Sequence, residues 1–173
     1  MKYAGFDLLL SGLFLAMALV FPIVFHALGL GNAFLPMFFP IVAAGFLVDL
    51  PLALVVGILS PLVSAVLTGM PPFFPPIAFV MMAEGLVLSG LPALLHQRWR
   101  FPLLPTLALT LLVDRLVVLA AVVLVARWLT LPEGVLGLAA VIQGLPGLVL
   151  MFVVIPPLVK SLTKRKRHLA ALE

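Results

Sequence analysis

The sequence predicts an all-α membrane protein: a bundle of six transmembrane helices with both the N-terminus and the C-terminus in the cytoplasm. Three observations predict this class. Hydrophobic residues make up 65% of the 173-residue chain and charged residues only 9%, and the mean hydropathy is +1.36. Six apolar runs, divided by turn residues, follow one another along the chain. The basic residues are distributed as the positive-inside rule requires for an even number of spans.

This composition argues against a soluble globular protein. A soluble domain carries about a quarter charged residues, and a chain of this size buries only about 70% of its unfolded surface. Much of the apolar surface must therefore face lipid. The first run continues to Pro22 without a small-residue cleavage site, which favours a first span over a removable signal peptide. The chain has no cysteine, which excludes disulfides and thiolate metal sites. A single domain is expected over residues 1–173.

Each apolar run is assigned one helix. A straight span needs about 20 residues at a rise of about 1.5 Å per residue. The second run is shorter, so its helix must be tilted, buried in protein, or extended by the preceding loop. The six runs are Gly5 to His26, Phe34 to Val48, Pro51 to Thr68, Pro75 to Leu95, Leu103 to Trp128 and Gly134 to Lys160.

The basic residues set the expected orientation. With the N-terminus inside, the cytoplasmic side collects Lys2, Arg98, Arg100 and a short basic tail over residues 160–173, whereas the outer side receives only Arg127. The tail follows the last apolar run directly, and it is interpreted as an anchor that faces anionic lipid headgroups. The net charge of +4 is thereby accounted for, and no nucleic-acid partner is expected.

Two outer connections have an unusual composition. The first contains Gly29, Gly31 and Asn32, which suit tight or left-handed backbone. The second is rich in proline and phenylalanine, and its prolines stiffen an extended path. Such rigid aromatic loops can form the wall of a pocket or can be stiff connectors only, and the residues leave both interpretations open. The three outer connections are His26 to Ala33, Gly69 to Pro76 and Arg127 to Glu133.

Ionisable residues occur inside two of the predicted spans. Glu84 lies in the fourth run, and Asp114 and Arg115 lie in the fifth. A charged group at the centre of a span costs about 2.5 to 3.5 kcal/mol on insertion scales, so each needs a partner or a function. Two interpretations carry equal weight: the three groups neutralise one another within the bundle, or they contact a polar solute.

Hydroxyl and amide side chains add weaker candidates. Ser60, Ser64 and Thr68 repeat every four residues and share one helix face. Such hydroxyls usually bond a carbonyl one turn back, so only Thr68, next to the outer loop, is a candidate ligand contact. Gln143, in the outer half of the sixth run, is expected either to bond a neighbouring helix or to contact a solute.

Signatures of enzymatic chemistry are missing from the sequence. The three histidines fall in different places, His26 at one membrane face and His96 and His168 at the other, so they cannot share one metal ion. There is no nucleophile elbow, zinc-protease motif or phosphate-binding loop. Neither catalysis nor ATP hydrolysis is expected, and no cofactor or metal site is predicted.

Three stretches resemble the substrate-binding S components of energy-coupling factor (ECF) vitamin transporters. The first is Phe34-Leu-Pro-Met-Phe-Phe-Pro-Ile-Val-Ala-Ala-Gly-Phe-Leu. The second runs from Gly57 to Pro72 and is followed by Met82-Ala-Glu-Gly. The third is Gly144-Leu-Pro-Gly-Leu together with Ile155-Pro-Pro-Leu-Val. Their order and spacing cover most of the chain.

The resemblance implies an outward-facing pocket for a small vitamin or vitamin precursor. The matching positions for that pocket are Asn32, Met70, Phe73, Glu84 and Gln143. Aromatic and methionine surfaces suit a flat heterocycle, and one carboxylate and two amides would orient its polar edge. A ring nitrogen or amine is the expected group opposite Glu84.

The resemblance also implies partners: a transmembrane coupling subunit and two cytosolic ATPases. Gly12 and Ala16 match the small-residue face that docks the coupling subunit, as Gly-x-x-x-Ala instead of the commoner Ala-x-x-x-Ala. The expected location is the cytoplasmic membrane of a bacterium or archaeon. The alternative is a structural or assembly subunit of a membrane complex without a solute ligand. A membrane enzyme of lipid metabolism would need clustered carboxylates or histidines at one face, which the sequence does not offer.

Overall fold

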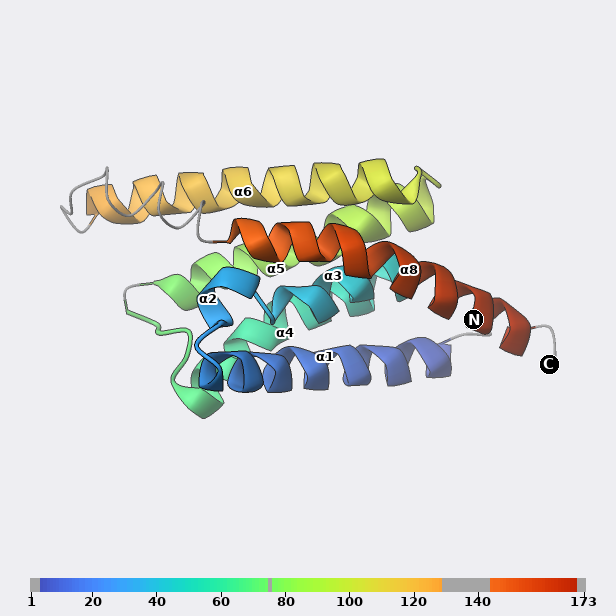
Figure 1. The fold of residues 1–173 in the computed structure, drawn as a ribbon, viewed down its shortest axis with the longest axis horizontal. Helices are drawn as coiled ribbons and strands as arrows, with labels where there is room; N and C mark the ends of the chain where they lie inside the picture. Colours follow the sequence, from blue (N-terminus) through green and yellow to red (C-terminus); the bar gives the residue numbers. More distant parts are fainter. Residues whose placement is uncertain (1–3, 75, 129–143, 171–173) are drawn as a thin grey trace.

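The computed structural model describes residues 4–74, 76–128 and 144–170, and within these ranges every regular element is helical. Figure 1 shows the helices lying roughly side by side as an elongated bundle. In chain order the elements are α1 (Ala4–Ala27), α2 (Gly31–Phe34), α3 (Phe38–Leu47), α4 (Leu50–Thr68), α5 (Ile77–Pro92), the π-helix η1 (Ala93–Arg98), α6 (Leu103–Trp128) and α8 (Leu145–Ala170).

Five of the described helical segments are long and apolar enough to cross a membrane. This confirms the all-helical class and a multi-pass membrane protein as its coarse description. The six spans expected from the sequence are not confirmed. The second apolar run forms helix α3, which is shorter than the five candidate spans of the described residues. The five segments are Gly5–Ala27, Leu50–Thr68, Ile77–Arg98, Leu103–Val125 and Leu145–Lys166.

Helix α3 can be shorter than a membrane span because it is enclosed by protein. Every residue of α3 except Phe39 is buried, and the helix contacts α1, α4, α5, η1 and α8. At 10 residues it rises about 15 Å, roughly half the hydrocarbon thickness of a bilayer. Of the three possibilities for the second run, burial in protein is therefore the one observed. The core around it includes Ile41, Val42, Val56, Leu88, Leu107, Met151 and Ile155.

A side chain from η1 completes the hydrogen bonding at the end of α3. The last four carbonyl groups of any helix lack partners within the helix. Nε2 of Gln97 donates to the carbonyl oxygens of Gly45 and Val48, at 2.7 Å in each case. The backbone then turns extended at Val48, and α4 begins at Leu50 with Pro51 in its first turn, where a missing N–H does no harm.

Glycines bring α4 and α5 into backbone contact. A Cβ atom on Gly57 would lie 2.5 Å from Oγ of Ser89 and 2.8 Å from the carbonyl carbon of Gly85. A Cβ atom on Gly85 would overlap the carbonyl oxygen of Gly57. Small residues at a crossing let two helix backbones approach closely, which is the usual packing mode in membranes. This crossing fixes α5, and with it Glu84, which directly precedes Gly85.

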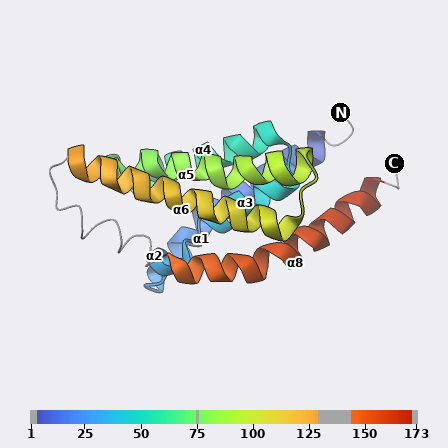
Figure 2. The same ribbon diagram turned by 90° about the horizontal axis from the view of Figure 1, so that it is seen from above.

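The first and last described helices meet at one end of the bundle. Figures 1 and 2 both place the start of α1 and the end of α8 at that end. The segment that the sequence assigns to a basic tail continues α8 as a helix as far as Ala170. Helix α8 changes direction along its length in both views, and Pro156 and Pro157, which lie inside it, supply the ordinary cause of such a bend.

Candidate functional site

Two neighbouring helices place three ionisable side chains together inside the bundle. Glu84 lies seven residues into α5, about 10 Å from its first residue, and Asp114 lies about 16 Å from the start of α6. The two helices pack against each other. Glu84 and Asp114 are both buried, and the Arg115 side chain is only 12% exposed. The charges therefore lie well inside the candidate spans.

Arg115 contacts both carboxylates. Its Nε and Nη2 atoms donate to the same oxygen of Asp114, Oδ2, at 3.0 and 2.6 Å. Nη2 also lies 3.6 Å from Oε1 of Glu84, which is ion-pair distance but too long for a hydrogen bond. The guanidinium is thus held mainly by its chain neighbour and shared with the glutamate across the helix interface. We call these three residues, Glu84, Asp114 and Arg115, the charged centre.

The charged centre contains a buried acceptor without a donor. Among the described residues, Oδ1 of Asp114 is buried and accepts no hydrogen bond. Two ionised carboxylates facing one guanidinium also carry a net charge of −1. A buried acceptor without a donor costs about 1 to 3 kcal/mol, and more when it is charged. The arrangement therefore has room, chemically, for one further donor or cation: a proton, an amine or a protonated ring nitrogen.

Residues far apart in the sequence cover the charged centre. A Cβ atom added to Gly144 would lie 2.9 Å from Nη1 of Arg115 and 3.0 Å from Cδ1 of Leu35. Leu35 follows α2 with a left-handed φ of 51°, and a Cβ on Gly147 would lie 2.6 Å from the carbonyl oxygen of Phe34. The segment around α2 and the start of α8 therefore close over Arg115. The centre lies where α2, α5, α6 and α8 meet.

The residues expected in a solute pocket fall into three groups. Glu84 belongs to the charged centre. Asn32 lies in α2, the helix next to Leu35, but its side chain is outside the described part of the structure. Gln143 also lies outside the described residues. The contacts that the resemblance implies for these two amides are therefore still predictions.

The remaining predicted contacts lie at the C-terminal end of α4 and in the loop that follows it. Oγ1 of Thr68 donates to the carbonyl oxygen of Ser64 at 2.8 Å, and Ser60 bonds Val56 in the same way, one turn back. Ser64 differs from this expectation, because its Oγ donates forward to the carbonyl oxygen of Met70 at 2.7 Å. Gly69 then ends α4 with a φ of 72°. Met70 and Phe73 in the proline-rich loop are 62% and 44% exposed. They lie in the loop that precedes α5, and Glu84 is about 10 Å along α5 from its first residue, so a solute that touches this loop and Glu84 would have to extend into the bundle.

The predicted docking face of α1 is open. Gly12 and Ala16 are exposed, and a Cβ atom on Gly12 would meet nothing within 4 Å. Leu9 and Leu13 on the same side are also exposed. The bundle itself therefore leaves this small-residue face uncovered.

Sequence reasoning missed a second ion pair. Nζ of Lys166 lies 2.5 Å from Oδ1 of Asp7 and 3.2 Å from the carbonyl oxygen of Leu47. Asp7 is buried near the start of α1. Lys166 thus turns into the bundle, in contrast to the headgroup anchor expected for it. The available signal was Asp7 itself, an acidic residue within an apolar run.

The described part of the chain contains no cluster of three or more side chains that could bind a metal ion. Comparison with family models, with curated proteins and with solved structures gives no match for this chain.

Proposed function

We propose that the protein is a solute-binding subunit embedded in the membrane, an S component of an ECF-type importer. It captures a small vitamin or vitamin precursor, a flat heterocycle with an amine or ring nitrogen, from the outer side. A transmembrane coupling subunit and two cytosolic ATPases supply the energy for its delivery. The protein itself has no enzymatic activity in this proposal, and it resides in the cytoplasmic membrane of a bacterium or archaeon.

The observation that carries the proposal is the buried acceptor on Asp114. Its Oδ1 atom has no hydrogen-bond donor among the described residues, and Glu84 shares with it a single guanidinium. An unmet charged acceptor inside a span is costly and is therefore expected to have a function. A solute nitrogen that donates to Asp114 and faces Glu84 would satisfy the acceptor and neutralise the excess negative charge.

The architecture supports the same proposal. Five candidate spans and the enclosed helix α3 account for the six apolar segments that the resemblance implies. The start of α1 and the end of α8 share one end of the bundle, which suits two cytoplasmic termini. Arg98 and Arg100 lie in and directly after η1, and Arg127 lies at the far end of α6, in accord with the expected orientation. The open Gly12 face offers a surface for a coupling subunit.

A second candidate function rests on the contacts of Arg115. The guanidinium joins the carboxylates of two helices, as it would in a structural or assembly subunit that binds no solute. A proton held between Glu84 and Asp114 would then balance the charge. The two functions differ in whether the folded protein contains a small molecule.

The test is to extract the protein from its native membrane in a mild detergent, purify it, denature it and analyse the released small molecules by mass spectrometry. The solute-binding function predicts one nitrogen heterocycle close to one equivalent per chain. A structural subunit predicts that no small molecule is enriched over a control membrane protein purified in the same way.

A further inference from the structure

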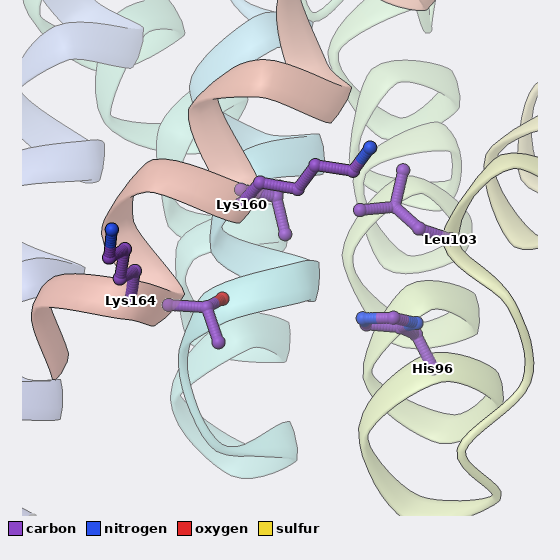
Figure 3. Close-up of a pocket in the computed structure, with 6 residues that line it drawn as sticks. His96, Leu103, Lys160 and Lys164 are labelled. Atoms are coloured by element: carbon purple, nitrogen blue, oxygen red, sulfur yellow. The ribbon is translucent and has the colours of Figure 1, made fainter. Parts of the chain in front are cut away.

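An open groove lies at the end of the bundle opposite the Arg127 end of α6. Its volume is about 360 Å³, within the range of about 300 to 1,000 Å³ found for small-molecule sites. The groove runs between α8 on one side and η1 with the start of α6 on the other (Figure 3). It is lined by His96, Leu103, Val159, Lys160, Thr163 and Lys164.

One face of α8 supplies most of the polar groups. Lys160, Thr163 and Lys164 are spaced by three and four residues, so they share a helix face. Figure 3 shows Lys160 extending from α8 toward Leu103, whereas the ammonium group of Lys164 points in the opposite direction, away from His96 and Leu103. Lysine side chains are flexible, so both ammonium groups can turn toward the Thr163 hydroxyl on the same helix face and donate to the several oxygens of a phosphate.

His96 faces these residues in a fixed orientation. Its Nδ1 lies 2.7 Å from the carbonyl oxygen of Phe101. A carbonyl oxygen only accepts, so Nδ1 carries a proton. The ring also packs edge-on against Phe46, with centroids 5.3 Å apart. Nε2 is therefore left for a ligand, and Figure 3 shows one ring nitrogen directed toward α8.

The lysines of the groove lack an internal counter-ion. Among the described residues, no carboxylate pairs with Lys160 or Lys164, and no acidic side chain lines the groove. Lys166, half a turn further along α8, differs because Asp7 neutralises it. The groove thus concentrates positive charge that the protein does not balance itself.

Apolar side chains lie next to the groove where two candidate spans begin and end. Leu103 is the first residue of one candidate span, and another ends at Arg98. Trp99, Phe101 and Leu104 are exposed close to these points in the chain. Tryptophan is enriched where a membrane protein meets the headgroup layer. The groove therefore lies at the level where a headgroup would meet its acyl chains.

We propose that this groove is a binding site for the phosphate of an anionic phospholipid. Lys160, Lys164 and the Thr163 hydroxyl bind the phosphate oxygens, and Nε2 of His96 contacts the glycerol or headgroup hydroxyls. The acyl chains follow the exposed apolar surface around Leu104. Basic pockets between helices are a recognised means of holding anionic lipids. The proposal is independent of the solute bound at the charged centre.

Native mass spectrometry of the purified protein tests this site. The equilibrium constant for binding of the first ligand molecule to the protein is measured for dioleoylphosphatidylglycerol, for dioleoylphosphatidylcholine and for inorganic phosphate. The test variant combines Lys160→Gln with Lys164→Gln. The control combines Arg98→Gln with Arg165→Gln, which removes the same charge from exposed positions outside the groove. Thermal unfolding verifies that both variants are folded.

The unmodified protein is expected to bind the anionic lipid about tenfold more tightly than the zwitterionic one. The groove variant should lose about 25-fold in affinity for the anionic lipid, since each of the two lysines near a headgroup contributes about fivefold. The control variant should lose less than about threefold. Equal losses in the two variants would show diffuse surface charge and overturn the site. Phosphate binding that needs the two lysines, without a preference for anionic lipid, would overturn the lipid as occupant.

Discussion

Replacing Gly85 by alanine should force α4 and α5 apart. The added Cβ would lie 2.8 Å from the carbonyl carbon of Gly57 and 3.2 Å from its Cα, and it would overlap the Gly57 carbonyl oxygen. Carbon atoms in ordinary contact are about 3.5 to 4.0 Å apart. All of these neighbours are backbone atoms, which cannot rotate away, so the helices must separate by about 1 Å.

The energetic cost is that of overpacking. Helix α5 packs against both α4 and α6, so it has no free space to move into when it is pushed away from α4. Overpacking a well-packed interior costs about 1 to 3 kcal/mol, which is the expected loss of stability.

Thermal unfolding of the purified protein in detergent measures this loss. For a chain of this size about 1 kcal/mol corresponds to about 2 to 4 °C, so Gly85→Ala should lower the Tm by about 2 to 12 °C. Gly12→Ala is the matched control, because a Cβ at Gly12 meets nothing within 4 Å. It should leave the Tm unchanged or slightly higher, since alanine favours helix. Equal Tm values for the two variants would refute the close crossing.

Three further substitutions test other contacts. Asp7→Asn removes the ion pair between Asp7 and Lys166, so limited proteolysis should cut the end of α8 several times faster; Asp49→Asn, at an exposed acidic residue, should leave the rate unchanged. Gln97→Leu removes both donations to the end of α3 and should cost about 1 to 3 kcal/mol, measured as a Tm decrease. Gly12→Leu should abolish copurification with a coupling subunit while the retained solute persists, and normal copurification would contradict the docking face.

The helices could be predicted because lipid imposes strong rules on composition. Length and hydropathy located the apolar runs, and the short second run was recognisable by counting residues. Its burial depends on contacts with five other elements, which no local pattern encodes. The continuation of α8 to Ala170 had a local signal: no glycine or proline follows Pro157, and lysine and arginine are good helix formers.

The charged centre could be predicted in part. Charges inside apolar runs are conspicuous, so Glu84, Asp114 and Arg115 were identifiable from the sequence, and their mutual contact was one of two open interpretations. The approach of Leu35 and Gly144 was not predictable, because it follows from how α2 and α8 pack. The pair between Asp7 and Lys166 joins residues 159 positions apart, and composition alone does not distinguish Lys166 from its basic neighbours.

The central claim is that the charged centre binds a solute nitrogen. The most direct measurement compares the small molecule retained per chain by the unmodified protein, by Glu84→Gln and by the control Asp49→Asn, all purified identically and verified as folded. Loss of a hydrogen bond to a charged group costs about 1.5 to 3 kcal/mol, so Glu84→Gln should weaken solute binding by about tenfold or more. Asp49→Asn should retain the solute fully. Retention by folded Glu84→Gln protein at the unmodified level would contradict the claim.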